Sequence, residues 1–220
     1  NSSKGDANEI KGGNKVQSVA SIVHGDYTVT SAPKRVELLR EPPKINDTYK
    51  KLYGDNPLIP DSEFESLRDK RYCLINVWRN INPYPVSEMP LAACDAASVP
   101  LSDLVTFEVR YQDRTGENYL VGYSEAPEGQ DRPHHRWVYF PHMTRDEVML
   151  IKCWDSKGSD FAGLDLGAEP PEERKTLRRV GDEPYLASLA LHSAFKDPTT
   201  PADSKSRESI EVRTIAFFDD

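Results

Sequence analysis

The chain has 220 residues, of which 37% are hydrophobic and 29% charged, and its formal net charge is −8. This size suits one substantial domain, here residues 1–220, and the acidic balance opposes binding to nucleic acid or to an anionic membrane surface. No apolar run reaches the roughly 18–20 residues that a membrane-crossing helix needs, so we expect a folded domain with no nucleic-acid or membrane partner.

The N-terminal stretch, residues 1–15, is rich in Gly, Asn, Lys and Ser without hydrophobic periodicity. This composition predicts a mobile lead-in. The chain does not begin with Met, which leaves a removed leader open. The next residues, "VQSVASIV" (16–23), have the composition of a strand and lead directly into His24.

Two later segments are expected to be lids or insertions. Residues 44–70 carry repeated Pro, Gly, Asn and Asp and predict a loop with one short helix. Residues 158–185 include the charged stretch "LGAEPPEERKTLRRVGDEP", which predicts an exposed helix or a flexible loop.

Between and after these segments the residue pattern of the chain is typical of a β protein. Short runs rich in Val, Ile, Tyr, Phe and Trp are separated by Pro, Gly and Asp, which predicts a mainly β sandwich or barrel. Thr144 and Glu147 have the capping-box spacing of a short turn before a strand. The predicted strands are "YCLINVW", "PLAACDA", "NYLVGYS", "HRWVYFP", "EVMLIKCWD", "YLASLALHSAF" and "SIEVRTIAFF".

The cysteines Cys73, Cys94 and Cys153 are far apart, and each lies in an apolar context. An odd number without C-x-x-C spacing argues against a disulfide framework and against a structural zinc site. We therefore expect buried, reduced thiols and a cytoplasmic protein.

The pair His24 and Asp26 is the first candidate for chemistry. Residues i and i+2 of a strand share a face, and Gly25 between them leaves the opposite face uncrowded. A remote histidine would complete a 2-His-1-carboxylate set, which is typical of non-heme Fe(II) oxygenases. Of the five histidines, only His192 lies in an apolar alternating segment, and it is the preferred third ligand. Taken alone, a His-x-Asp pair is more often structural or exposed than metal-bound.

A candidate carboxylate anchor follows downstream in "RESIEVRTIAFF", where Arg207 and Ser209 share a face. A guanidinium fork can hold a carboxylate through two hydrogen bonds, and a hydroxyl can add a third. The alternative is that Arg207 and Arg213 are surface cations that balance Glu208 and Glu211.

Candidate substrate contacts are less specific. Asn76 and Trp78 share one strand face and could line a pocket, although a tryptophan in a strand is more often a packing residue. Tyr27, next to the candidate ligands, has the same two interpretations.

The order of these motifs resembles the Fe(II)/2-oxoglutarate-dependent oxygenases, and within them the AsaB-like hydroxylase/desaturase family of secondary metabolism. The resemblance implies a double-stranded β-helix (jelly-roll, cupin-like) core with a few short flanking helices. It implies His24, Asp26 and His192 as iron ligands, and Arg207 with Ser209 as the 2-oxoglutarate anchor, with Arg213 as the alternative. The segments on which the resemblance rests are "VHGDYT", "INVWRNI", "PLAACDAASV", "DLV", "HRWVYFPHMTRDEVMLIKCWDS", "LHSAFKDPTTP" and "RESIEVRTIAFF".

The activity implied by the resemblance uses Fe(II), 2-oxoglutarate and O2 to form a ferryl-oxo species. This species would hydroxylate, desaturate or cyclise a small natural-product intermediate. Two alternatives stay open: a non-heme iron oxidase that does not need 2-oxoglutarate, and a non-catalytic β-barrel that binds small molecules. The sequence also leaves a homodimer open.

Overall fold

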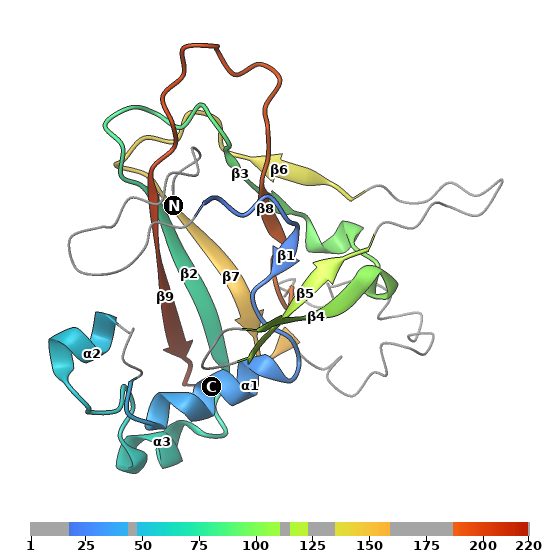
Figure 1. Cartoon of the computed structure of the whole chain (residues 1–220). Helices are drawn as coiled ribbons and strands as arrows, with labels where there is room; N and C mark the ends of the chain where they lie inside the picture. Colours follow the sequence, from blue (N-terminus) through green and yellow to red (C-terminus); the bar gives the residue numbers. More distant parts are fainter. Residues whose placement is uncertain (1–17, 44–47, 111–114, 123–134, 159–186, 220) are drawn as a thin grey trace.

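The computed structural model describes residues 18–43, 48–110, 115–122, 135–158 and 187–219 (Figure 1). The predicted lead-in at 1–15 and the segment 159–185 lie outside these residues.

The described strands form two antiparallel sheets (Figure 1). The larger sheet has the strand order β4-β5-β1-β8-β3-β6 and the smaller one the order β7-β2-β9. The larger sheet contains β1 (His24–Gly25), β3 (Leu91–Cys94), β4 (Leu104–Arg110), β5 (Thr115–Val121), β6 (Trp137–Tyr139) and β8 (His192–Ala194). The smaller sheet contains β2 (Tyr72–Asn80), β7 (Val148–Asp155) and β9 (Ser209–Phe217).

One hydrophobic core joins the two sheets. Trp78 and Ile151 contribute from the smaller sheet, Tyr119 from the larger sheet and Leu191 from the residue just before β8. Burial of these side chains is the main force that holds the two layers together. The prediction of a mainly β, jelly-roll fold with a few short helices is confirmed.

The helices of residues 31–67 gather at one end of the smaller sheet, near β2 and β9 (Figure 1). Val36, Leu39, Ile59 and Phe64 form a second, smaller cluster there. Among the described helices, none combines the length and the apolar character that crossing a membrane requires. The helices are α1 (Ser31–Glu37), η1 (Leu38–Arg40), α2 (Thr48–Tyr53), α3 (Asp61–Leu67), η2 (Ala96–Ser98) and η3 (Leu101–Asp103).

The segment 44–70 is more helical than expected, since its described part holds both α2 and α3. Phe64 of α3 is almost fully buried in the smaller cluster. This helix therefore has a packing role, and its role as a lid stays a prediction.

All seven of the strand segments quoted above contain a strand, but the prediction of a strand at residues 16–23 is wrong. Over the described residues 18–23 only an isolated bridge at Ser18 is present, and β1 is limited to two residues. Strand composition produces a strand only where a neighbour pairs with it. The sheet neighbours β5 and β8 pair with His24, and β5 also pairs with Gly25.

Two local predictions are confirmed. The Thr144 backbone N–H donates to Glu147 Oε2 at 2.7 Å, which is the reciprocal bond of a capping box, just before β7. All three cysteines are free and buried.

Candidate metal centre

The candidate centre begins with two histidines that face each other on neighbouring strands. His24 and His192 are directly paired between β1 and β8, and their ring centroids are 4.5 Å apart. Nδ1 of His24 lies 2.8 Å from the carbonyl oxygen of Ile22, and Nδ1 of His192 lies 3.0 Å from that of Ala190. Because a carbonyl can only accept, each Nδ1 carries the proton, which leaves the lone pair of each Nε2 for a metal ion.

Asp26 supplies the oxygen ligand of the set. Its Oδ1 lies 3.9 Å from Nε2 of His24, and its Oδ2 lies 3.7 Å from Nε2 of His192. Ligand atoms from the three residues all lie within 4.8 Å of one another. Asp26 is in a bend just after β1, so the expectation that it continues the strand is wrong. The bend, not strand alternation, turns the carboxylate toward the imidazoles.

The protonation states of Asp26 and His24 suit metal binding. Burial favours a raised pKa for Asp26, but Arg213, His192 and the Cys153 thiol outweigh it and lower the pKa below its ordinary value. Burial, assisted by His192, lowers the pKa of His24. An ionised carboxylate and neutral imidazoles are the forms that bind a metal. Two nitrogens and one oxygen form the 2-His-1-carboxylate set, which fits iron.

Gly25 allows close packing behind the centre. A Cβ added there would lie 2.8 Å from Cδ1 of Leu189 and 3.5 Å from Cδ2 of Leu191. The opposite face is therefore filled by core leucines, and the expectation of an uncrowded face is wrong. Glycine is needed because β1 approaches these side chains closely.

The smaller sheet directs a row of polar residues toward the centre. Asn76 donates from Nδ2 to Asp26 Oδ2 at 2.7 Å, so the even-numbered residues of β2 face the candidate ligands. The register of β2 and β9 extends this row: Asn76 is paired with Arg213, Trp78 with Glu211 and Asn80 with Ser209.

Arg207 lies farther along the same face, just before β9. Its side chain is buried, its Cζ lies 5.5 Å from the ring centroid of Trp78, and it donates to the carbonyl of Met89. Burial lowers its pKa to about 10, so it remains a cation at neutral pH. Trp78 is two residues from Asn76, a separation of about 7 Å along a strand. Ser209 is buried and paired with Asn80, and the Arg207 guanidinium lies over Trp78, so both residues lie farther along this face than Arg213, which is paired with Asn76.

Arg213 lies much closer to the ligands. Its Nη2 is 3.4 Å from Asp26 Oδ1, and its Cζ lies 5.9 Å from the ring centroid of Tyr27. Burial opposes the charge of Arg213, but the Asp26 carboxylate raises the pKa of the guanidinium. Tyr27 is itself buried in the main core.

Sequence reasoning missed two residues of this site. Cys153 of β7 places Sγ 3.1 Å from Asp26 Oδ2, and Glu211 of β9 accepts from Asn76 Nδ2 at 2.9 Å. Alternation from Ser209 places Glu211 on the same strand face, but no site role was assigned to it, and it was considered only as a possible partner of the arginines. No sequence signal identifies Cys153, because its contact depends on how the two sheets pack.

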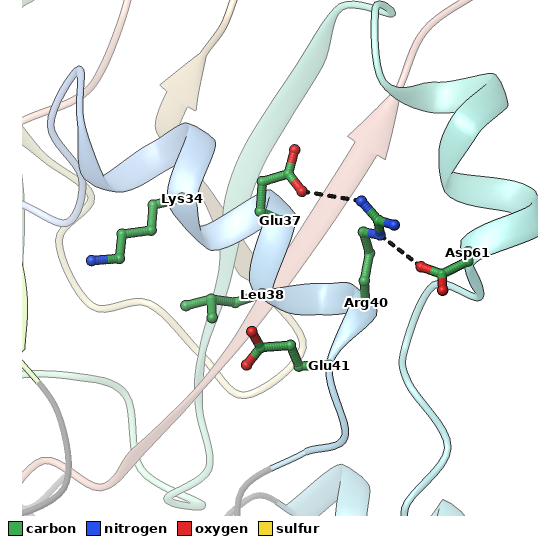
Figure 2. Close-up of a pocket in the computed structure, with 6 residues that line it drawn as sticks. All are labelled: Lys34, Glu37, Leu38, Arg40, Glu41 and Asp61. Atoms are coloured by element: carbon green, nitrogen blue, oxygen red, sulfur yellow. Dashed lines mark hydrogen bonds and ion pairs between the residues drawn. The ribbon is translucent and has the colours of Figure 1, made fainter.

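A separate surface hollow of about 340 Å³ lies beside α1, η1 and α3 (Figure 2). Figure 2 shows Arg40 between Glu37 and Asp61, with which it forms ion pairs. None of the predicted site residues lines this hollow, and its lining includes no imidazole or thiol. We therefore assign it no part in the metal centre. The lining residues are Lys34, Glu37, Leu38, Arg40, Glu41 and Asp61.

Comparison with known proteins adds a family and a fold. Residues 2–166 and 169–217 match the family model described as Oxidoreductase/YMDC permease-like domain. The chain is 31% identical over 166 residues to the hydroxylase/desaturase asaB of Aspergillus flavus, covering 72% of this chain and 60% of asaB. It is 34% identical over 166 residues to the hydroxylase/desaturase efuI of Hormonema carpetanum, covering 74% of this chain and 46% of efuI.

Among solved structures, the chain resembles an iron and alpha-ketoglutarate-dependent endoperoxidase, NvfI, with a TM-score of 0.58 and 24% sequence identity. The match covers 96% of this chain and 57% of NvfI. The fold is therefore shared with that enzyme. The chain spans about half of the length of the relatives that it matches.

Proposed function

The chain belongs to the Oxidoreductase/YMDC permease-like family, with hydroxylase/desaturases such as asaB among its relatives, and we propose that it is a non-heme Fe(II)/2-oxoglutarate-dependent oxygenase. Its substrate would be a small natural-product intermediate that is hydroxylated, desaturated or cyclised.

The observation that carries this proposal is the convergence of His24, Asp26 and His192 from distant parts of the chain, with ligand atoms within 4.8 Å. Both Nε2 atoms face the carboxylate while both Nδ1 atoms are held by carbonyls. A surface cluster formed by chance would not have its tautomers set in this way. His24, Asp26 and His192 would hold the iron ion and would leave positions on it open for a chelating cosubstrate and O2. Bound iron would supply the oxidising chemistry.

The protein's own part would be to bind and orient. We propose that Arg207 and Ser209 hold the distal carboxylate of 2-oxoglutarate, since Arg207 is a buried cation over the ring of Trp78, and Trp78 lies about 7 Å along β2 from Asn76, which contacts Asp26. Arg213 is the alternative anchor. Its ion pair with Asp26 makes it the closer neighbour of the metal.

The roles of Trp78, Tyr27 and Asn76 as substrate contacts stay proposals. Trp78 and Tyr27 border the candidate centre through Arg207 and Arg213, which stack over their rings. Asn76 borders it through its bond to Asp26. The whole chain, 1–220, would act as one oxygenase domain, with 44–70 and 158–185 as lid or insertion segments.

The proposed compartment is the cytoplasm, which the three free, buried thiols support. Homodimer formation stays a prediction, which size-exclusion chromatography with light scattering would test.

The test is an anaerobic titration of the metal-free protein with Fe(II) and then with 2-oxoglutarate. We expect the weak visible charge-transfer band of the iron chelate in the wild type. His24→Ala, Asp26→Ala and His192→Ala should each lose the band and the turnover while keeping the far-UV circular dichroism spectrum. Wild-type turnover in any of these variants would refute the ligand assignment.

The two alternatives give different results in the same titration. Iron binding without a band, combined with O2 consumption in the absence of 2-oxoglutarate, would identify an oxidase that takes its electrons from the substrate. No iron binding at all would favour a non-catalytic binding module.

A further inference from the structure

We propose that Asn76 and Cys153 are positioning residues that fix the Asp26 carboxylate by donating to the same oxygen, Oδ2, and leave Oδ1 for the metal ion. Asn76 Nδ2 lies 2.7 Å and Cys153 Sγ 3.1 Å from Oδ2. This inference rests on the metal centre of the proposed function and adds to it two residues outside the ligand set.

Asp26 needs such support because of its place in the chain. The residue lies in a bend after a two-residue strand, so no regular strand geometry sets the direction of its side chain. Both histidines belong to the larger sheet, whereas Asn76 and Cys153 belong to the smaller one. The two donors therefore reach the carboxylate from the opposite layer of the sandwich.

The orientation of the Asn76 amide follows from its neighbours. Nδ2 lies 2.7 Å from Asp26 Oδ2 and 2.9 Å from Glu211 Oε1. Carboxylates accept hydrogen bonds, so only the NH2 end of the amide can face both. Its two protons are then committed, one to each carboxylate. Asn76 is 1% exposed, as expected for a fixed internal donor.

Cys153 reaches Asp26 at an irregularity in the sheet. Leu74 is paired with Trp154 and Ile75 with Lys152, so the register shifts at Cys153 and leaves it without a partner on β2. A β-bulge of this kind can redirect a side chain and is common beside active sites. Cys153 is fully buried, and its Sγ lies 3.1 Å from Asp26 Oδ2 and 3.4 Å from the carbonyl oxygen of Ile151, so the carboxylate is the nearer acceptor for its S–H.

The two donors determine how the carboxylate is used. Oδ2 accepts from an amide and a thiol, so both of its lone pairs are engaged. Oδ1 instead lies 3.4 Å from Nη2 of Arg213, whose side chain is 58% exposed. The carboxylate should therefore bind metal through one oxygen. Residues that orient a ligand in this way typically contribute about 10–100-fold to metal affinity.

The experiment compares two substitutions at Cys153. Cys153→Ser keeps a hydrogen-bond donor at this position. A buried hydroxyl usually destabilises a protein more than the methyl group of alanine does. Cys153→Ala removes the donor but leaves an apolar site. Co(II) affinity of the metal-free protein is measured by calorimetry, together with the visible Co(II) spectrum and thermal unfolding. Cys73→Ala and Cys73→Ser are the matched controls, because Cys73 is a buried thiol on the other face of the same sheet.

We expect Cys153→Ala and Asn76→Ala to bind Co(II) about 10-fold or more weaker with an altered spectrum. The Co(II) affinity of Cys153→Ser should stay within about 3-fold of the wild-type affinity, because the hydroxyl can still donate to Asp26 Oδ2. A purely structural role predicts the reverse order at Cys153, with serine the more damaging substitution. That order, or unchanged affinity in Cys153→Ala and Asn76→Ala, would overturn the inference. If the wild type itself binds neither Co(II) nor Fe(II), the proposed function fails as well.

Discussion

At Asp26 a cation and a metal ion would compete for one oxygen. Arg213 lies 3.4 Å from Oδ1, and its side chain is 58% exposed, so the guanidinium can move away at little cost in packing. In the metal-free protein it places a positive charge beside the buried Asp26 carboxylate, whose amide and thiol donors, Asn76 and Cys153, are neutral. Arg213 can therefore act as a substitute cation whose place the metal takes.

This difference between the two arginines predicts which one anchors the cosubstrate. Arg207→Ala should raise the 2-oxoglutarate concentration for half-maximal charge-transfer absorbance by about 10–100-fold, the loss expected for a charge-assisted hydrogen bond. Arg213→Ala should raise it less, because Arg213 is already paired with Asp26. Arg79→Ala, at an exposed position of β2, is the control. A larger effect for Arg213→Ala would transfer the anchor to that residue.

Gly25 predicts a cost for the smallest substitution. Gly25→Ala would bring its Cβ within 2.8 Å of Leu189 Cδ1, in the filled core. We expect a loss of about 1–3 kcal/mol in the free energy of unfolding, typical of overpacking. Gly122→Ala, whose Cβ first meets Val105 Cγ2 at 3.4 Å, is the control in urea denaturation. Equal stability of the two variants would contradict the packing argument.

At the scale of elements, sequence patterns located strands well where buried and exposed residues alternate or where the apolar residues form a continuous run. β2 and β7 were anticipated from their apolar composition, and α2 with α3 only in part. β4 was not anticipated, because this edge strand exposes Val105 and Phe107 and lacks a clear apolar face. β1 was overestimated, because a strand of two residues depends on its neighbours more than on its own composition.

The candidate site was anticipated to the extent that it follows local spacing. The pair His24 and Asp26 was found from an interval of two residues, and His192 from its apolar context. The anchor role of Arg207 and Ser209 stays a prediction. Contacts that cross the sandwich could not be anticipated. The approach of Cys153 to Asp26 depends on how the two sheets pack against each other, which no local pattern encodes.

The junction of β2 and β7 carries a prediction on pH. Asp155 is fully buried at the end of β7 and accepts from Arg71 Nη2 at 2.8 Å and Nε at 3.1 Å. Burial opposes ionisation, but the Arg71 bonds outweigh it, so the pKa of Asp155 lies below its ordinary value of 3.8. A depressed pKa stabilises the fold above about pH 4, and this contribution is lost as the pH falls through the lowered value.

Asp155→Asn should therefore lower the free energy of unfolding at pH 7 by about 3–5 kcal/mol, because it leaves the charge of Arg71 without its partner. Its stability should also fall less steeply than that of the wild type below pH 4. Urea denaturation at pH 7 and pH 3 measures both effects. Asp61→Asn, which alters an exposed ion pair with Arg40, should change little. Parallel acid profiles for wild type and Asp155→Asn would exclude Asp155 as the titrating group.

At the scale of the whole molecule, the candidate centre joins the two layers. The histidines come from the larger sheet, and the groups that contact Asp26 from the other side come from β2, β7 and β9. A ligand that binds only the folded state stabilises it by mass action. Metal should therefore strengthen the sandwich as a unit.

Saturation with Co(II) at about 100 times the dissociation constant should raise the free energy of unfolding by about 2.7 kcal/mol. For a domain of this size that corresponds to a rise of roughly 5–10 °C in the melting temperature. Calorimetry of wild type and Asp26→Ala, each with and without Co(II), checks this prediction. An equal rise in Asp26→Ala would show that the metal stabilises the protein from another place.

The pairing of His24 with His192 also has a consequence during synthesis on the ribosome. About 170 residues separate the two partners, so at about 5–20 residues per second the second imidazole is made roughly 10–30 s after the first. Through this interval β1 lacks the strand β8 that flanks it on one side, and no complete ligand set exists. At the proposed centre, iron could therefore be captured by the complete ligand set only after His192 has been translated, and a nascent chain that ends before this residue should bind it no better than a chain without His192.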